Sequence, residues 1–426
     1  MGSSYIDLYR EYTKESEAPA FYHLWSSLSS LAAFIGRDCW IEHGYFPVYP
    51  NLYLMLIGSP GTRKSTAIKL SKKIIVEAGY ENIAAEKTSK EKFLFDLAAQ
   101  NDHSLLDEGD GRKGRNGVDV LEMNLWGDDD WATKPPANTY IAADEFNDFI
   151  GSGNMEFISL LGNLWDFNGV FKHRVKNGKS IAIPNPTINL FGGNTPTGFA
   201  TCFPPETLGQ GFLSRLLLIY GEPTGVKITF PKPPSPSATA TLIDYLVRIK
   251  TTVVGQLIMD SEAETLLDQI YKQFSPIDDP RFSSYSNRRF THLLKLCILC
   301  AASRISKVIQ REDVLFANTI LAHTESMMPK ALGEFGKGKH SDVVHTIVQI
   351  LEDANRPLSV KEIFGAVFQD VDNPMQVSTM LQNLELAGKA QRVGGSWLPK
   401  KQVATNIDST MVQWDMLTQQ ERNNYE

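Results

Sequence analysis

The stretch Asn51–Ser65 reads NLYLMLIGSPGTRKS and carries the strongest structural signal in the chain. Asn51–Ile57 is a short, mostly apolar run of the kind found in buried strands. Glycine and proline follow at once and mark a turn, and a helical pattern then runs from Ser65 to Ala78. A buried strand, a glycine-containing loop and a helix, in that order, are the context of a phosphate-binding P-loop. The stretch therefore predicts an α/β fold with a nucleotide site.

The loop matches the P-loop pattern G-x-x-x-x-G-K-[ST] except at Arg63, which stands where the pattern has its second glycine. Glycines let backbone amides surround a phosphate, and the helix N-terminus adds its positive end. We expect Lys64 to reach the β- and γ-phosphates and Ser65 to ligate Mg²⁺. The alternative is a surface turn with a chance Lys-Ser pair. The residues expected to bind the nucleotide are Gly58, Ser59, Pro60, Gly61, Thr62, Arg63, Lys64, Ser65 and Thr66.

A second strand candidate ends in two acids about eighty residues after the P-loop, in the stretch Tyr140–Glu145 (YIAADE). This is the layout of a Walker B segment. We expect Asp144 to hold Mg²⁺ through water and Glu145 to act as general base on the attacking water. Acids at strand ends are common, so the spacing from the P-loop gives this interpretation its weight.

The strand candidate Thr187–Phe191 is followed by two glycines and then Asn194. A polar side chain at that end can orient a water near the γ-phosphate, and we take Asn194 as the sensor-1 candidate. The alternative is an asparagine that only stabilises a turn.

A fourth strand candidate, Leu216–Tyr220, follows the sequence GQGFLSR, which ends at Arg215. An arginine in this place can project from one subunit into the nucleotide site of a neighbour, and such a finger can raise the rate by about 10³–10⁵. The alternative is a surface arginine with a local partner. Strands that alternate with helices predict a mostly parallel sheet.

The order of these parts resembles the AAA+ ATPases, and most of all the minichromosome-maintenance-like branch and the phage and plasmid replicative helicases. Ser214-Arg215 is similar to that branch's arginine finger, with Leu216 in place of phenylalanine. Arg288, ahead of LLKL, resembles its sensor-2 arginine, with Arg289 as the fallback. The resemblance implies a P-loop NTPase core of the AAA+ type, with ATP and Mg²⁺ as cofactors and a homo-oligomeric, hexameric ring.

The basic stretch Phe171–Ile181 (FKHRVKNGKSI) lies between the second and third strands. Its Asn-Gly pair is a strong hairpin signal. It resembles the pre-sensor-1 hairpin that helicases of this branch point into the ring channel. The alternative is an ordinary solvated hairpin. The side chains expected to hold single-stranded DNA by its phosphates are Lys172, Arg174, Lys176 and Lys179.

The rest of the chain divides around this core. The pattern from Tyr5 to Phe34 is helical, the stretch Leu242–Leu332 looks all-helical, and three helical patterns with a Gly-Gly hairpin predict a C-terminal winged helix-turn-helix. The predicted parts are a helical N-terminal segment (1–45), the ATPase core (46–225), a helical lid (226–335), the winged helix (341–401) and a polar tail (402–426).

Composition excludes some classes of protein. The formal charge of −7 argues against a generally basic nucleic-acid coat, so any DNA contact must be local. No long apolar run predicts a membrane span, and the N-terminus lacks the layout of a secretory signal. Cys297 and Cys300 sit in an apolar helical run and are read as buried thiols rather than metal ligands, which favours a reducing, cytoplasmic location.

The sequence as a whole predicts a ring-shaped, ATP-driven DNA helicase or translocase that serves the replication of a phage or mobile element. Its expected partners are single-stranded DNA, further copies of the chain and other replication proteins, with no membrane. Two alternatives remain: an AAA+ helicase loader or origin-remodelling ATPase, and a nucleotide-switched winged-helix regulator. The predicted recognition helix, Met375–Leu386, carries no Lys or Arg, which makes base readout by it doubtful.

Overall fold

The computed structural model describes residues 4–101, 134–151, 153–173, 181–203, 211–277, 279–333, 341–354, 356–368, 370–371, 373–386 and 390–399. Within these ranges the chain forms two compact units, one that reaches Leu332 and one that starts at Gly333. We call them the sheet unit and the C-terminal unit. The predicted boundaries at residues 45 and 225 both fall inside the sheet unit and stay predictions.

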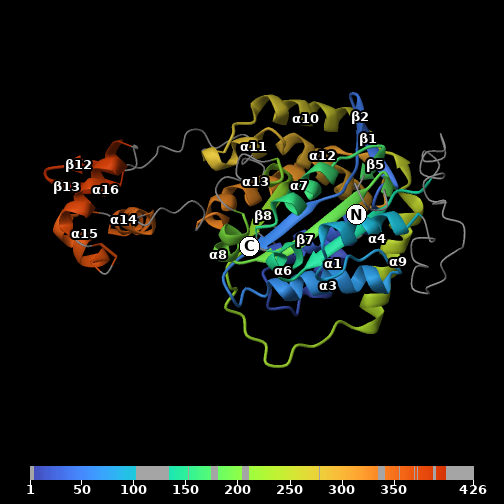
Figure 1. Cartoon of the computed structure of the whole chain (residues 1–426), viewed down its shortest axis with the longest axis horizontal. Coiled ribbons are helices and arrows are strands. Elements are labelled where there is room, and N and C mark those ends of the chain that lie inside the picture. The colour runs from blue at the N-terminus through green and yellow to red at the C-terminus, as the bar shows by residue number, and fades with distance from the viewer. Residues whose placement is uncertain are drawn as a thin grey trace, which may run out of the picture. The chain divides into compact units, whose positions relative to one another are not determined.

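The sheet unit is built on four parallel strands (Figure 1). They are β3 (Tyr53–Ile57), β4 (Asn138–Ala143), β7 (Thr187–Asn194) and β8 (Leu216–Tyr220), and they lie in the order β4-β7-β3-β8. Every residue of β3 and β7 is buried, as the central strands of a helix-covered parallel sheet should be. The predicted α/β class with a parallel sheet is confirmed. We call the two edges at which these strands begin and end the amino edge and the carboxyl edge.

Helices α1 (Tyr5–Thr13) and α2 (Ala20–Ile35) take the place of the single helical pattern predicted from Tyr5 to Phe34. Pro19, which has no N–H to continue a helix, stands at the N-cap of α2. Helix α3 (Lys64–Glu77) packs against α2 and against β7, and its bounds lie within one residue of the prediction. These helices place the start of α3 at the carboxyl edge of the sheet.

Four further helices belong to this half of the unit: α4 (Lys90–Ala99), α6 (Phe146–Ile150), α7 (Met155–Leu164) and α8 (Pro196–Cys202). Of these, α6 and α7 pack against β7. A short hairpin, β5 (Val170–His173) with β6 (Ile181–Pro184), follows α7. Lys172 pairs with Ala182 in this hairpin, so the described stem agrees with the predicted turn. The predicted DNA-binding residues Arg174, Lys176 and Lys179 lie outside the described residues.

The second half of the sheet unit is mostly helical, but three short strands interrupt it. Its helices are α9 (Pro236–Thr252), α10 (Ser261–Gln273), α11 (Ser283–Ser286), α12 (Arg289–Ser303) and α13 (Arg311–Ala331), with the 3₁₀ turns η4 (Leu213–Arg215) and η5 (Pro280–Phe282). Its strands are β9 (Gly255–Gln256), which pairs with β1 (Cys39–His43), and β10 (Ile258–Met259), which pairs with β11 (Val308–Ile309); β2 (Phe46–Val48) completes a hairpin with β1. The all-helical prediction is wrong here because two-residue strands leave no period-two pattern in a sequence.

All four cysteines are buried and unbridged. Cys297 and Cys300 lie on α12, so their predicted burial in a helix is confirmed, and that burial raises the pKa of both thiols. Among the helices that the structure describes, none combines the length and the apolar character that a membrane span requires.

The C-terminal unit has three helices and a two-stranded antiparallel hairpin. They are α14 (Ser341–Ala354), α15 (Val360–Val367), α16 (Pro374–Leu386), β12 (Ala390–Val393) and β13 (Ser396–Pro399). Leu358 and Trp397 exchange backbone hydrogen bonds of 2.9 and 2.7 Å, which fix the hairpin to the segment before α15. Buried apolar side chains from all three helices surround Trp397 in one core. The elements are those expected of a winged helix, and that name stays a prediction.

Candidate nucleotide site

Three chain segments meet at the carboxyl edge of the sheet. β3 ends at Ile57, which is level with Asn194 on β7, and β4 ends at Ala143, which is level with Gly192. The loop after β3 contacts β7 directly, because the Gly58 N–H donates to the Asn194 carbonyl over 3.4 Å. The predicted residues of the P-loop, the acidic pair and the sensor are therefore brought together at one edge of the sheet, where open α/β sheets bind ligands.

The loop of residues 58–63 needs glycine at its first position. A Cβ on Gly58 would stand 2.6 Å from the Gly221 carbonyl and 2.7 Å from the Tyr22 hydroxyl, closer than real side chains approach. That hydroxyl donates to the Ile57 carbonyl over 2.8 Å and so fixes the end of β3. Burial raises the pKa of Tyr22, which keeps it a donor. Close packing around Gly58 therefore sets the path of the loop.

Arg63 departs from the P-loop pattern, and two features of the structure allow an arginine at this position: its backbone conformation and an ion pair with Glu17. It takes a left-handed conformation (φ 61°) at the N-cap of α3, where glycine is more usual. Its guanidinium pairs with Glu17 at 2.5 Å, and Glu17 in turn accepts the Ile228 N–H over 2.6 Å. The arginine thus points away from the loop toward the chain that follows β8, and no side chain caps α3.

Lys64 is folded back onto its own loop. Its Nζ donates to the carbonyls of Gly58 and Ser59 over 2.8 and 3.0 Å and to the Thr62 hydroxyl over 3.2 Å. Burial lowers the pKa of the amine, and the nearby Glu145 carboxylate acts in the opposite sense. The loop therefore holds a buried cation beside the uncapped positive end of α3, which together suit a phosphate.

The acidic pair lies directly after β4. Asp144 pairs with Lys69 of α3 at 2.8 Å, and Glu145 is exposed at the N-cap of α6. A Cβ on Gly193 would stand 2.5 Å from the Asp144 carbonyl, so this glycine lets β7 approach the acidic segment. Asp144 is thus anchored between α3 and β7, while Glu145 faces solvent at the same edge.

Asn194 is buried, and its orientation is fixed by a second asparagine. Its Nδ2 donates to the Asn147 Oδ1 over 2.8 Å, and its Oδ1 accepts the Thr195 N–H over 2.9 Å. Asn147 lies on α6, directly beyond the acidic pair, so α6 joins the sensor candidate to the predicted general base. Both hydrogen bonds also fit the alternative of a turn-stabilising asparagine.

The donor set suits Mg²⁺. Within the described ranges no three His, Cys, Asp or Glu side chains form a metal cluster. Mg²⁺ bound with a nucleotide does not need one, because it takes one or two protein ligands and fills its shell with phosphate oxygens and water. Ser65 is the second residue of α3 and Asp144 directly follows β4, both at the carboxyl edge. Their side-chain oxygens fit the ion.

A cavity of about 500 Å³ opens beside the start of α3. Arg63, Thr66 and Leu70 line it from the loop and α3, and Tyr12 lines it from α1. The segment that follows β8 closes it with Ile228, Pro231, Pro233 and Pro234. The volume lies within the range of small-molecule sites, and the mostly apolar wall suits a flat heterocycle.

Arg215 and Arg288 do not lie at this site. Arg215 directly precedes β8, whose first residue, Leu216, is level with Tyr53 at the start of β3. The length of β3 places it about 13 Å or more from the P-loop along the strand direction. The guanidinium carbons of Arg215 and Arg288 each lie 6.0 Å from the ring centre of Trp165, so the two arginines form a second cluster at the amino edge.

At the amino edge, the charge of Arg288 affects the pKa of Arg215. Burial lowers the pKa of Arg215, the positive charge of Arg288 lowers it further, and Asp166 opposes both. Arg289, the fallback for Arg288, is buried and pairs with Glu325 at 2.7 Å and with Asn318 at 2.8 Å, which makes it a structural residue.

Sequence reasoning missed Tyr22, Asn147 and Glu17 at this site. Tyr22 lies in the apolar stripe of α2 and carries no signal of its own. Asn147 follows the acidic pair closely and was the one residue that proximity in sequence could have indicated. Glu17 lies between α1 and α2, and it reaches Arg63 because α2 packs against α3.

Neither a comparison with protein-family models nor one with curated proteins gives a match for this chain. Its function therefore has to be inferred from the motifs and from the geometry of the site.

Proposed function

We propose that this chain is an ATP-driven motor of the AAA+ type that assembles into a ring, expected to be hexameric, and moves along single-stranded DNA in replication. One observation carries the proposal: Lys64, Asp144, Glu145 and Asn194 gather at the carboxyl edge, whereas Arg215 and Arg288 cluster at the amino edge. A site for hydrolysis that includes both sets needs two copies of the chain.

In the proposed reaction, water attacks the γ-phosphorus as the bond to the β–γ bridging oxygen breaks, which yields ADP and phosphate. Lys64 leaves its loop carbonyls for the phosphates, and Glu145 accepts the proton of the water. Asn194, held by Asn147, orients that water. Ser65 and Asp144 would hold Mg²⁺, which would neutralise charge on the phosphates. The cavity beside Arg63 and Thr66 takes the base.

A neighbouring copy completes this site in the proposal. Its Arg215 and Arg288 approach the γ-phosphate and stabilise the charge that develops as the phosphoryl group transfers. A head-to-tail contact, in which the amino edge of one copy meets the carboxyl edge of the next, closes into a ring when the rotation between copies divides a full turn. This arrangement makes assembly a condition of activity.

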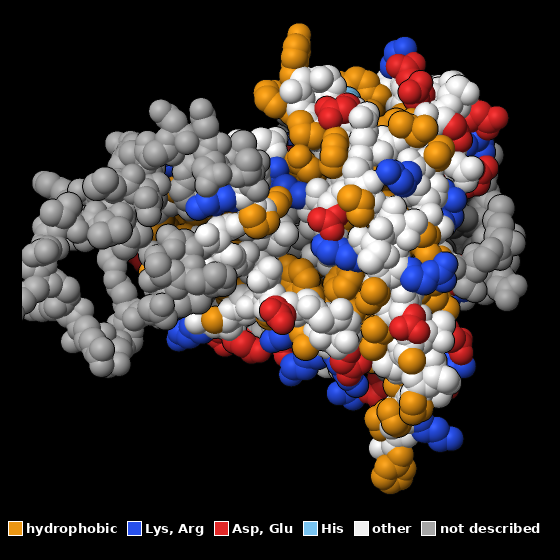
Figure 2. Space-filling view, turned by 90° about the vertical axis from the view of Figure 1, so that its right-hand side faces the viewer, with side chains coloured by type: hydrophobic (Ala, Val, Ile, Leu, Met, Phe, Trp, Pro, Cys, Tyr) orange, Lys and Arg blue, Asp and Glu red, His pale blue; other side chains and the backbone are white. Residues whose placement is uncertain are grey.

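The grip on DNA is assigned to the β5–β6 hairpin. Figure 2 looks onto the side of the molecule that carries β1, β5, α4 and α9 in Figure 1, and there Lys and Arg side chains lie interspersed with Asp and Glu. A net charge of −7 also argues against a generally basic surface. The exposed Lys172 on the stem, with the basic residues 174–179 of the same stretch, therefore supplies local phosphate contacts in the proposal.

The experiment is to measure ATP hydrolysis and strand release on forked DNA of both polarities, with Lys64→Ala as the inactive reference. We expect hydrolysis that single-stranded DNA stimulates and strand release on one polarity. Hydrolysis without strand release on either polarity would reject the helicase and favour the loader. Full function of the Lys64→Ala variant would reject any motor and favour the winged-helix regulator.

A further inference from the structure

A short segment at the amino edge, Trp165–Asn168, connects α7 to the β5–β6 hairpin. β5 begins at Val170, so only Gly169 separates this segment from the hairpin. Gly169 exchanges two hydrogen bonds of 2.8 Å with Asn185, which follows β6. The segment is thus continuous with both strands of the hairpin, and anything that fixes it fixes the base of the hairpin.

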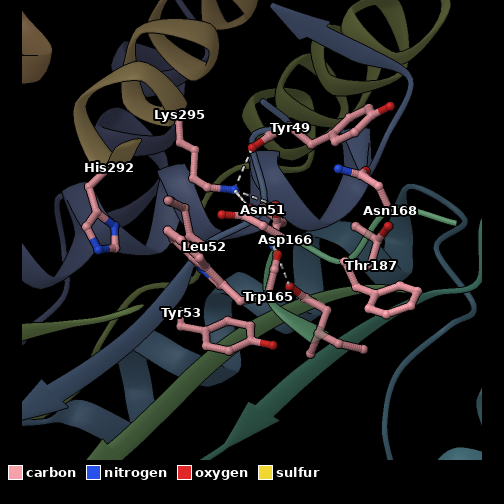
Figure 3. Close-up of polar contacts among 12 residues, drawn as sticks. Tyr49, Asn51, Leu52, Tyr53, Trp165, Asp166, Asn168, Thr187, His292 and Lys295 are labelled. Atoms are coloured by element: carbon pink, nitrogen blue, oxygen red, sulfur yellow. Dashed lines mark hydrogen bonds and ion pairs between the residues drawn. The ribbon is translucent and has the colours of Figure 1, made fainter. Parts of the chain in front are cut away.

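Lys295 of α12 clamps the first half of this segment (Figure 3). The side chain is fully buried, and its Nζ donates to the Tyr49 carbonyl over 2.8 Å, to the Asn51 Oδ1 over 2.7 Å and to the Asp166 Oδ1 over 2.8 Å. The same ammonium lies 4.5 Å from the ring centre of Trp165. A buried lysine is tolerated only with such a full set of partners.

Arg37 clamps the second half. Its Nη1 donates to the Asn168 Oδ1 over 2.7 Å, and its Nη2 donates to the Phe167 carbonyl. Its Nε donates to the Thr187 hydroxyl over 2.6 Å, at the first residue of β7. The segment is therefore fastened to the central sheet at one end and to α12 at the other.

The arginine pair rests on the same segment. Arg215 and Arg288 both lie at 6.0 Å from the Trp165 ring, and the His292 ring packs against it at 5.1 Å. His292 also holds the turn that carries Arg215, because its Nε2 donates to the Ser214 carbonyl over 3.1 Å. Helix α12 thus supplies Arg288 at its N-cap, His292 against Ser214 and Lys295 against Asp166. The indole ring of Trp165 therefore lies beside four side chains: Arg215, Arg288, His292 and Lys295.

We infer that the Trp165–Asn168 segment is a positioning element that couples the position of the β5–β6 hairpin to that of the arginine pair. DNA that binds to the hairpin then changes the placement of Arg215 and Arg288. This inference rests on the proposed function, and it adds the route by which DNA stimulates hydrolysis in the neighbouring copy. Trp165 and Asp166 contact neither nucleotide nor DNA in this account. They act through the arginines.

The test compares four full-length variants with the wild type: Asp166→Asn, Trp165→Leu, Trp165→Phe and Asp38→Asn. Asp166→Asn removes the negative charge beside Lys295 but keeps an oxygen that can accept its hydrogen bond, so the set of partners of the buried lysine stays complete. Asp38→Asn is the matched control, because Asp38 pairs with Lys250 at 2.7 Å and has a similar exposure, 36% against 43%. The readouts are kcat and KM for ATP, each with and without single-stranded oligonucleotide.

We expect Trp165→Leu to lower the DNA-stimulated kcat about a hundredfold and Asp166→Asn about tenfold, because a displacement of about 1 Å is enough for such losses. KM for ATP stays within about twofold, since the P-loop is untouched. Trp165→Phe keeps a ring and retains most of the stimulation. Asp38→Asn behaves as the wild type.

Three results would overturn the inference in different ways. If the wild type hydrolyses ATP with DNA stimulation and Asp166→Asn is stimulated equally, the segment does not link hairpin and arginines, and the proposed function stands. If the wild type shows no stimulation by DNA at all, the proposed function fails and takes the inference with it. Equal losses of DNA-stimulated kcat in Asp166→Asn and Asp38→Asn would show that any loss of surface charge has this effect, and would also reject the inference.

Discussion

Arg215 and Lys64 lie at opposite edges of one parallel sheet. Arg215 directly precedes β8, which starts level with the first residue of β3, and Lys64 follows the loop at the end of β3. β3 spans five residues between the two edges, about 13 Å at about 3.3 Å per residue, so the two cations do not meet at one phosphate within a single chain. This separation is what makes a shared site between two copies the central element of the proposal.

Loss of Arg215 should remove turnover and spare binding. We expect Arg215→Ala to lower kcat about 10³-fold or more, because the arginine acts only on the charge that develops in the transition state. The affinity for ATP, measured by a fluorescent nucleotide analogue, should stay within about threefold. Arg248→Ala is the control, since Arg248 is an exposed arginine on α9 that lies over the Tyr245 ring. Equal loss in both variants would contradict the assignment.

The cavity beside α3 should bind the base of the nucleotide. Leu70→Asp places a carboxylate in its apolar wall, and we expect KM for ATP to rise about tenfold because the base would then meet a charge that is costly to desolvate. Val76→Asp is the matched control: Val76 lies on the same helix, is 48% exposed and does not line the cavity. Unchanged KM in Leu70→Asp would place the base elsewhere.

Gly58 should be required by packing and not only by phosphate binding. Gly58→Ala drives a Cβ into the Gly221 carbonyl, and we expect it to lower the free energy of unfolding of the sheet unit by about 1–3 kcal/mol. Gly365→Ala is the contrast: Gly365 lies inside α15 with nothing near its missing Cβ, so alanine should stabilise the C-terminal unit by about 0.5–1 kcal/mol. Urea unfolding measures both, and a neutral Gly58→Ala would refute the packing argument.

Stability should fall in mild acid because of buried histidines. Burial lowers the pKa of His23 from 6.5 to about 4, and no described residue hydrogen-bonds either of its ring nitrogens. Between pH 6.5 and pH 4 the unfolded chain binds more protons than the folded chain. The contribution of neutral His23 to the free energy of unfolding is therefore fully present above pH 6.5 and is lost as the pH falls toward 4. His23 alone accounts for about 2 kcal/mol at pH 5.

The His23→Leu variant isolates that contribution. It should lose less stability between pH 7 and pH 5 than the wild type does, while His292, whose pKa burial also lowers to about 4, keeps part of the dependence. Urea unfolding at the two pH values gives the difference. A pH dependence identical to that of the wild type would show that His23 is not held neutral.

The sequence indicated the parts of the site that lie in continuous motifs, and the structure supplied the contacts between them. The apolar run before Gly58 and the acids after Ala143 could be read as strand ends, because a buried strand leaves a local pattern. Lys295 could not be read in this way: it stands among leucines in an apolar helix, and its partners Asn51 and Asp166 are distant in sequence. Tyr22 and Glu17 were hidden for the same reason.

Where the arginines lie was also beyond the sequence. The motif order suggested that Arg215 serves a neighbour, but only the register of β8 with β3 shows how far it stands from its own P-loop. The choice between Arg288 and Arg289 likewise depended on packing, since Arg289 turned out to be buried against Glu325. Arg288 and Arg289 are adjacent and share one sequence pattern, but Arg288 lies near Trp165 whereas Arg289 is buried against Glu325.

The most direct test of the shared site is to mix two inactive variants, Lys64→Ala and Arg215→Ala, and to measure ATP hydrolysis by the mixture. Each variant lacks one half of the site, and in a mixed assembly an intact P-loop meets an intact arginine edge. We predict that an equal mixture recovers about one quarter of the wild-type rate, the frequency of such pairs when copies assemble at random in a head-to-tail ring. A mixture that stays as inactive as its two components would contradict the account.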